Sequence, residues 1–287
     1  MATTVRQSFA ELRRNLEITD LQASTVSTRQ SKVREVLQDG MTVLDSFLVG
    51  SYQRNTMIRP LKEADVDIFV VLDPKYYDAS GYASLLDKVK GTLRKAYETP
   101  DISRNGQAVT IFFSDFRVDV VPAFNRTGGG YLIPNSVLKQ WISTHPKVHI
   151  DQWASENKVH GGDLVPLLKM LKAWNRENGS LMTSFHLETL ALKILTGVTI
   201  SDFWSGARYV FDKARTLVPY PVLDPAGYGG NVGAYLNTAA KVSNVVSHLE
   251  TAYSRAVSAE ELESNGKTSE AVAKWRLVFG SYFPAYG

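Results

Sequence analysis

Two aspartates two residues apart open an apolar run in the first quarter of the sequence. Asp65 and Asp67 begin the segment DVDIFVVL, residues 65–72, whose composition is typical of a buried β-strand. Because strand side chains alternate between the two faces of a sheet, both carboxylates are expected on one face, about 7 Å apart along the chain. Two like charges side by side repel, and neither is easily desolvated. The pair therefore predicts a cation between them.

A third carboxylate, Asp119, stands within FRVDVVP on another predicted strand, with Val118 and Val120 pointing to the opposite face. If the two strands are neighbours, three carboxylates converge. Oxygen ligands without Cys or His favour Mg²⁺ or Mn²⁺ over Zn²⁺, and Mg²⁺ takes its remaining ligands from water and substrate phosphates. We therefore expect Asp65, Asp67 and Asp119 to be both metal ligands and catalytic residues, holding two Mg²⁺ ions, with Mn²⁺ as a substitute.

Gly50 and Ser51 follow another strand-like run and precede the aspartates by about 15 residues. A glycine lets phosphate oxygens approach the backbone, while exposed amides and the Ser51 hydroxyl supply donors at the start of a turn or helix. Metals held by the carboxylates could then align a hydroxyl with the α-phosphorus of a nucleoside triphosphate and stabilise the leaving pyrophosphate. Asp119 would help to deprotonate that hydroxyl.

Each of these features also has an ordinary structural explanation. A Gly-Ser pair is commonly a turn, and an Asp-x-Asp pair is commonly a solvated strand edge. Their order along the chain is harder to obtain by chance, because Gly-Ser comes first, Asp-x-Asp then opens an apolar strand, and a third acid lies inside another β run. The combination favours metal-dependent phosphoryl chemistry.

Composition narrows the class of protein. The 287 residues are 44% hydrophobic and carry a net charge of only +3, so a large core is expected and a nucleic-acid partner is not required by charge. There is no cysteine, which excludes disulfides, thiol nucleophiles and Cys-ligated zinc and fits a reducing compartment. No uncharged apolar run approaches about 18 residues, so we expect no membrane span and a cytoplasmic protein.

Hydrophobic periodicity predicts an α/β first half and a helical second half. Helices are expected over residues 5–16, from a Ser27-Thr28 cap to about Gln38, and over 85–97. Strands are expected over 41–50, over 65–72, and as two strands within 107–124 that turn near Ser114-Asp115. Glycines and prolines make 125–135 a predicted loop or hinge. Helices are predicted at 164–174, 184–195, 201–216, 231–259 and 266–280.

Several motifs together resemble a known family. GSYQRNT, DVDIFVVL, VDVVPA, LLKMLKAWN, SFHLETL and LDPAG look like the bacterial nucleotidyltransferases related to cyclic GMP-AMP synthase and oligoadenylate synthase, over roughly residues 25–240. The match is greatest to the CD-NTases of CBASS antiphage systems, which make cyclic oligonucleotide signals. The resemblance implies an α+β fold with a polymerase-β-like nucleotidyltransferase core, a mixed sheet with helices, over residues 1–130. It also implies an α-helical C-terminal lobe over 131–287, with the active site in the cleft between them.

The resemblance also implies roles for individual residues. Asp65, Asp67 and Asp119 match the metal-binding acids of the family, and Gly50-Ser51 matches its phosphate-binding turn. Lys169 and Lys172 resemble lysines that grip the donor triphosphate, with Lys172 preferred, although both could instead be solvated helical lysines. Ser184 resembles a serine near the donor phosphates, although serine is also a common helix N-cap. Arg54 belongs to the SYxRxT motif and either contacts nucleotide or only begins a helix.

The expected activity is therefore a template-independent nucleotidyltransferase. It would join NTPs, ATP or GTP, into a cyclic di- or trinucleotide second messenger, with release of pyrophosphate, for antiphage signalling through a diffusible product. Two alternatives stay open: nucleotide addition to RNA 3′ ends or another acceptor, and a catalytically silent nucleotide-binding regulator. The sequence shows no basic track or appended RNA module, which favours mononucleotide substrates over long RNA. It also shows no zinc-binding insertion or basic arm that would indicate a nucleic-acid activator. Regulation by protein partners also stays open.

Overall fold

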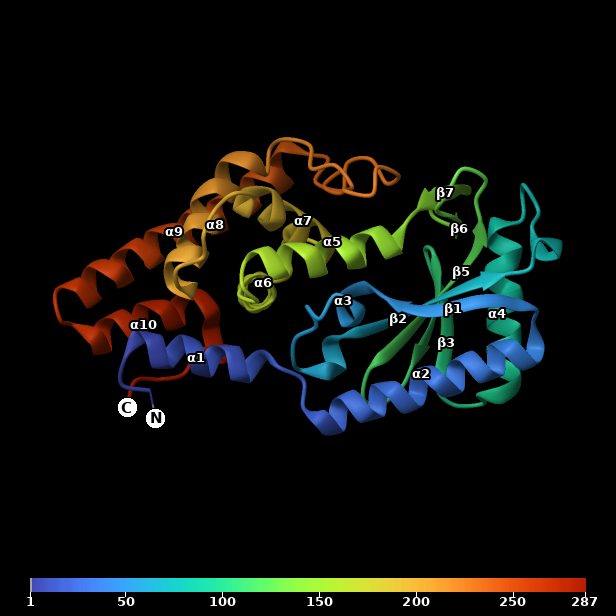
Figure 1. Ribbon diagram of the computed structural model, residues 1–287, viewed down its shortest axis with the longest axis horizontal. Coiled ribbons are helices and arrows are strands. Elements are labelled where there is room, and N and C mark those ends of the chain that lie inside the picture. Colours follow the sequence, from blue (N-terminus) through green and yellow to red (C-terminus); the bar gives the residue numbers. More distant parts are fainter. Residues whose placement is uncertain (1) are drawn as a thin grey trace. The chain divides into compact units, whose positions relative to one another are not determined.

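The computed structural model describes residues 2–287. The chain forms two compact units, which we describe separately (Figure 1). The sheet unit comprises Ile18–Gln152, and the helical unit comprises residues 2–17 together with Trp153–Gly287. The predicted α+β fold, with a mixed sheet and a helical C-terminal part, is confirmed.

The sheet unit is built on one seven-stranded sheet. The order β1-β2-β5-β4-β3 makes β2 and β5 central neighbours, and they are the parallel pair of this sheet. β6 and β7 extend the sheet from the end of β5 as an antiparallel hairpin. The elements are α2 (Asp20–Gly40), β1 (Val43–Val49), α3 (Gly50–Gln53), β2 (Asp65–Leu72), α4 (Tyr82–Ala96), β3 (Asp101–Asn105), β4 (Ala108–Phe112), β5 (Arg117–Asn125), β6 (Tyr131–Asn135) and β7 (Gln140–Thr144).

Side chains alternate along β2, so that one face of the strand packs against helices and the other carries the aspartates. Val66, Ile68 and Val70 point to the face covered by α2 and α4, and they share a buried core with side chains of both helices. The other face carries Asp65 and Asp67 at the start of the strand. Further along β2, that face is closed by a small cluster of hydrophobic residues that includes Phe69, Val71, Ala123, Tyr131 and Ile133. The acids therefore lie where this apolar cover ends.

The helical unit places α1 (Val5–Leu16) with the C-terminal helices. Phe9 of α1 is buried, and its ring contacts Trp204, Trp275, Phe279 and Phe283 at centroid distances between 5.0 and 5.9 Å. These aromatic contacts explain why the first helix belongs with residues far from it in sequence. The other helices are α6 (Leu164–Glu177), α7 (Ser184–Leu195), α8 (Phe203–Leu217), α9 (Ala239–Ser264) and α10 (Thr268–Phe279), while α5 (Pro146–Val159) crosses the boundary between the units.

Some predicted boundaries differ from the structure. The boundary expected after residue 130 lies at Gln152 instead, because β6 and β7 pair onto β5 and continue the sheet. The predicted hinge at 125–135 is the end of β5, a glycine turn and β6. α2 starts at Asp20 because Thr19 and Gln22 form a capping box upstream of the predicted start. α9 starts at Ala239, not near residue 231, and β3 was not predicted.

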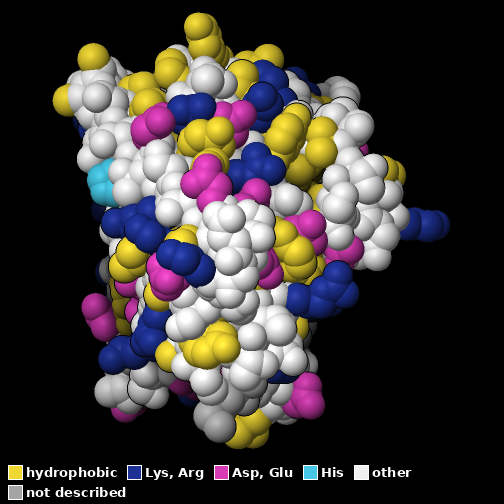
Figure 2. Space-filling model, turned by 90° about the vertical axis from the view of Figure 1, so that its left-hand side faces the viewer, with side chains coloured by type: hydrophobic (Ala, Val, Ile, Leu, Met, Phe, Trp, Pro, Cys, Tyr) yellow, Lys and Arg dark blue, Asp and Glu magenta, His cyan; other side chains and the backbone are white. Residues whose placement is uncertain are grey.

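Helix hydropathy and the charges on one face describe part of the surface. Within the described chain, no helix has both the length and the apolar character needed to cross a bilayer. On the face that Figure 2 presents, Lys and Arg side chains are interspersed with Asp and Glu side chains. Interspersed charges of this kind do not make a single-sign field on this face (Figure 2).

Candidate active site

The three predicted acids lie on adjacent strands of the sheet unit. β2 and β5 run parallel, and their register sets Asp67 directly opposite Asp119. Asp65 and Asp67 share a face because two residues separate them on one strand. The condition for the carboxylates to converge, that their two strands are neighbours, is therefore met.

Gly50 is required by the position of Asp67. Its φ of +65° lies in the left-handed region, and a Cβ at this position would fall 1.8 Å from Asp67 Oδ2. Residue 50 also begins the short helix α3, directly after β1. Only a glycine satisfies both the backbone conformation and the close approach. The Gly-Ser turn and the acids are thus in direct contact within one unit.

Thr110 fixes the third acid from the other side. It lies on β4 directly opposite Asp119, is 2% exposed, and donates its hydroxyl hydrogen to Asp119 Oδ1 at 2.5 Å. Burial raises the pKa of the Asp119 carboxyl, and nearby Asp65 acts in the same direction. The Thr110 hydrogen bond and the positive charge of Arg117 partly oppose this rise in pKa. The Thr110 hydrogen bond therefore orients the Asp119 carboxyl, while burial disfavours its charged form.

Arg117 supplies a positive charge beside the acids. Its Nε lies 2.6 Å from Asp65 Oδ1, and the two side chains are about equally exposed. As the side chains stand, no group of three or more His, Asp or Glu residues within residues 2–287 forms a ready metal site. The donor set nevertheless fits a divalent cation, because adjacent carboxylates are present and no Cβ crowds Asp67.

Ser51 and Arg54 lie in the same segment as Gly50. Ser51 is the second residue of α3, and its carbonyl accepts hydrogen bonds from Thr56 N–H at 2.8 Å and Met57 N–H at 3.1 Å. Arg54 ends α3 as its C-cap and is half-buried. The predicted phosphate turn is therefore a short helix held by its own backbone, with Arg54 at its far end.

The two predicted lysines lie in the helical unit, on α6. Lys169 is 3% exposed and pairs with Glu17 Oε2 at 2.5 Å. Lys172 is 7% exposed and pairs at 3.3 Å with Glu188 Oε1, a fully buried carboxylate that also accepts the Trp153 indole hydrogen at 2.8 Å. Neither lysine is the solvated helical residue that the alternative interpretation expected. Both are buried cations matched to a glutamate.

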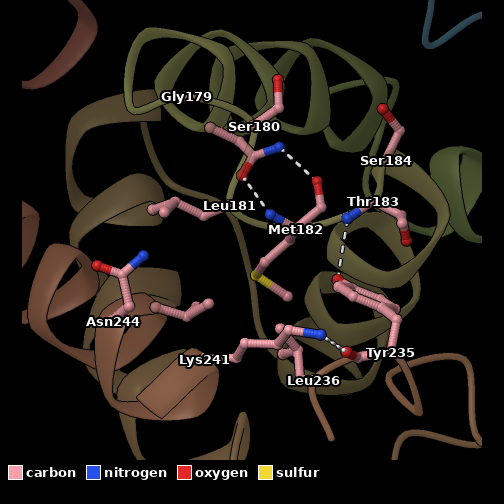
Figure 3. Close-up of a pocket in the computed structure, with 12 residues that line it drawn as sticks. Gly179, Ser180, Leu181, Met182, Thr183, Ser184, Tyr235, Leu236, Lys241 and Asn244 are labelled. Carbon is pink, nitrogen blue, oxygen red and sulfur yellow. Dashed lines mark hydrogen bonds between the residues drawn. The ribbon is translucent and has the colours of Figure 1, made fainter. Parts of the chain in front are cut away.

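Ser184 lies at the rim of a pocket in the helical unit. The N-cap of α7 is Thr183, whose hydroxyl oxygen accepts from His186 N–H, so Ser184 does not have the capping role that was its alternative. The pocket has a volume of about 600 Å³. Figure 3 shows the Thr183 N–H donating to the Tyr235 hydroxyl at 2.9 Å on one side of it. The lining mixes polar and apolar groups: Ser180, Leu181, Leu236, Lys241, Asn244 and Val245.

Comparison with known proteins shows which family the chain belongs to. The profile of the family described as "Second Messenger Oligonucleotide or Dinucleotide Synthetase domain" matches residues 3–157, more than half of the 287-residue chain. The chain belongs to this family. The resemblance to bacterial cyclic-nucleotide-making nucleotidyltransferases is thereby confirmed, and the chain is a nucleotidyltransferase of the second-messenger synthetase class.

Relatives of the synthetase agree with this assignment. A "Cyclic AMP-AMP-AMP synthase" from an Acinetobacter species is 28% identical over an alignment of 306 positions, gaps included, that covers 98% of this chain and 86% of the relative. Escherichia coli CdnC, solved with ATP, has a TM-score of 0.78 at 20% identity, with 98% of this chain and 99% of that chain covered. The same protein has also been solved in a complex with HORMA, at a TM-score of 0.77, 19% identity and 98% coverage of both chains.

A third structure supports the fold of the synthetase. Vibrio cholerae DncV, a cyclic AMP-GMP synthase, has a TM-score of 0.67 at 19% identity, covering 97% of this chain and 87% of that chain. Similarity at this identity concerns the fold. It confirms an architecture of a mixed sheet with a helical C-terminal part.

Sequence reasoning missed several residues of the synthetase that surround the predicted ones. Thr110 lies inside AVTIF, and its pairing with Asp119 depends on strand register, which one sequence does not reveal. Arg117 was visible in principle, because it stands two residues before Asp119 and alternation places it on the same face. The Glu188–Trp153 contact joins positions 35 residues apart and left no local signal.

Proposed function

We propose that this synthetase joins nucleoside triphosphates, with ATP as the first substrate to test, into a cyclic oligonucleotide with release of pyrophosphate. The observation that carries the proposal is the placement of Asp119 opposite Asp67, with Gly50 in contact with the Asp67 carboxylate. The name of the Acinetobacter relative supports ATP as substrate and a cyclic trinucleotide as product. The product would act as a diffusible signal in antiphage defence, a role supported by the CBASS relatives from Escherichia coli.

Asp65, Asp67 and Asp119 are the residues that would hold Mg²⁺, two ions in our proposal, with Mn²⁺ as a substitute. The bound metal would supply positive charge to the phosphate oxygens and to the leaving pyrophosphate. Asp119 would accept the proton of the attacking hydroxyl, and the raised pKa that burial gives it makes it a stronger base than an exposed aspartate. Thr110 would keep its carboxylate in one orientation.

The remaining predicted residues have binding roles in this proposal. Gly50 and Ser51 would present backbone amides and a hydroxyl to phosphate oxygens, and Arg54 would add a positive charge at the end of the same segment. In the helical unit, Lys172 and Lys169 would bind phosphate oxygens of the donor triphosphate in place of their glutamate partners, and Ser184 would contact a phosphate. The pocket beside Ser184 is large enough for a nucleoside.

We place the protein in the cytoplasm, where NTPs and Mg²⁺ are available, and the absence of cysteine in its sequence fits that compartment. The complex of CdnC with HORMA supports a regulatory protein partner for this chain as well. The sequence shows no zinc-binding insertion or basic arm of the kind that would indicate a nucleic-acid activator.

The experiment that tests the proposal is product identification by mass spectrometry. Purified protein is incubated with Mg²⁺ and ATP alone, GTP alone or all four NTPs, and the mixture is treated with phosphatase. We expect a phosphatase-resistant product with the mass of a cyclic oligonucleotide, already with ATP alone. Extension of an added RNA oligonucleotide without a cyclic product would contradict the proposal, as would the absence of any phosphodiester product across metals and pH values.

A further inference from the structure

Arg117 lies beside Asp65, one of the three acids. It is the first residue of β5 and lies directly opposite Asp65 in the parallel register with β2. It precedes Asp119 by two residues, so its side chain leaves the same face of the sheet as all three carboxylates. The strand geometry therefore places the Arg117 guanidinium at the edge of the acid group, which is the set of the three aspartates.

The contact between Arg117 and Asp65 is an ion pair of limited directionality. Arg117 Nε lies 2.6 Å from Asp65 Oδ1, yet Nε makes no hydrogen bond of proper geometry in the described chain. The forked, two-bond arrangement that arginine can form with a carboxylate holds the side chain most firmly. At Arg117, charge attraction dominates, and both side chains are about 40% exposed. Such a guanidinium can swing away without disturbing the sheet.

The acid group needs a positive charge whether or not metal is present. Asp65, Asp67 and Asp119 lie on adjacent strands, and like charges at this spacing destabilise one another. In the described chain the three acids do not form a ready metal site, and Arg117 is beside one of them. The guanidinium thus contributes positive charge beside Asp65 in the metal-free protein.

We propose that Arg117 is a built-in counter-cation, a positioning residue that holds Asp65 while no divalent metal is bound and gives way when one binds. The inference rests on the proposed metal site at the three acids. Metal and guanidinium then compete for the same carboxylate, so Arg117 lowers the affinity for metal in the absence of nucleotide. The protein therefore binds metal tightly only when nucleotide is also bound, because the substrate phosphates then supply further ligands.

A second ion pair in the sheet unit provides a matched control. Arg104 of β3 pairs with Asp87 of α4 at 3.2 Å, and the Arg104 side chain is 41% exposed, against 42% for Arg117. Neither residue of this pair belongs to the acid group. Substituting Arg104 therefore removes an arginine of similar exposure without changing the charge beside Asp65.

The test measures Mn²⁺ binding to the full chain without nucleotide, by electron paramagnetic resonance of the free ion. We expect Arg117→Gln to bind Mn²⁺ about fivefold more tightly than wild type, the factor that corresponds to losing one exposed ion pair. Arg104→Gln should match wild type, and Arg117→Lys, which keeps the charge, should remain close to it. Metal-free Arg117→Gln should also melt at a lower temperature than wild type, with the difference removed by Mn²⁺.

Unchanged or weaker Mn²⁺ binding by Arg117→Gln would overturn the inference, since a counter-cation must oppose the metal. The variant Asp67→Asn shows whether a negative result concerns only the role of Arg117 or the proposed metal site as well. If Asp67→Asn weakens binding while Arg117→Gln does not tighten it, only the role of Arg117 is wrong. If Asp67→Asn leaves Mn²⁺ binding intact, the metal site is wrong and the inference falls with it.

Discussion

The backbone at Gly50 turns through a left-handed conformation against the carboxylate of Asp67. At the scale of single residues, the candidate site is a set of such close contacts. Thr110 touches Asp119, and Arg117 touches Asp65. Each contact either orients a carboxylate or balances its charge, so substitutions here should change chemistry more than folding.

Gly50→Ala tests the closest of these contacts. The new Cβ would fall 1.8 Å from Asp67 Oδ2, so the carboxylate or the turn must move. We expect product formation to fall by about 100-fold, the effect of displacing a catalytic group by about 1 Å. The measurement is the rate of cyclic product formation, with circular dichroism to verify the fold.

Gly91→Ala is the control for that substitution. Gly91 lies within α4, and a Cβ there meets no other atom within 4 Å. Alanine should stabilise this helix by about 0.5–1 kcal/mol and leave the rate unchanged. If Gly50→Ala were as active as Gly91→Ala, the contact between turn and acid would have no role in the reaction.

At the scale of elements, the sequence predicted the strands and the helix that carry the candidate site residues and missed several neighbouring strands. β2, β5 and α6 have long apolar patterns of clear period, so their predicted bounds are close to the structure. β6 contains Pro134 and follows three glycines, and both signals indicate a loop when tertiary pairing is unknown. Strand register and buried ion pairs join distant residues, so a local pattern cannot reveal them.

The buried pair on α6 and α7 makes an element-scale prediction. Lys172→Met would leave Glu188, a fully buried carboxylate, without its lysine, and should lower the free energy of unfolding by about 3–5 kcal/mol. The double variant Lys172→Met with Glu188→Leu should recover most of that loss. Urea denaturation followed by circular dichroism gives both values.

Activity of the same variants separates packing from binding. If Lys172 contacts substrate phosphates, the double variant should be stable but impaired, with a raised KM for ATP. Full activity in the stabilised double variant would mean that Lys172 only supports the fold.

The pocket between the start of α7 and α9 makes a second element-scale prediction. The Asn244 side-chain amide is exposed at this pocket and makes no hydrogen bond within the described chain, so it is available to a base or ribose. Asn244→Ala should raise the KM for ATP by about fivefold, the value of roughly one hydrogen bond, with kcat nearly unchanged. Steady-state kinetics measure this, and an unchanged KM would argue that nucleotide does not enter this pocket.

At the scale of the whole molecule, His186 links stability to pH. It is 1% exposed, and burial lowers its pKa to about 4 from a usual 6.5. The Tyr235 hydroxyl accepts from Thr183 N–H and so donates to His186 Nδ1, which is 2.9 Å away, in keeping with a neutral imidazole. Between about pH 6.5 and pH 4, His186 is therefore protonated in the unfolded chain but stays neutral in the folded chain.

Stability should accordingly fall as pH is lowered from about 6.5 to about 4, by about 2–3 kcal/mol from this residue. Because carboxylates also titrate in this range, the comparison is between wild type and His186→Gln, with half-exposed His248→Gln as control. Urea unfolding at pH 7.5, 6.0 and 5.0 should show a shallower decline for His186→Gln alone. Equal slopes in all three proteins would contradict a buried neutral His186.

In our proposal, the acids of β2 and β5 perform nucleotidyl transfer. The most direct measurement is the rate of pyrophosphate release from ATP and Mg²⁺ by wild type, Asp67→Asn and the control Asp87→Asn, an exposed position on α4. We predict that Asp67→Asn lowers the rate at least about 100-fold with the fold intact, while Asp87→Asn equals wild type. Pyrophosphate release by Asp67→Asn at the wild-type rate would contradict the account.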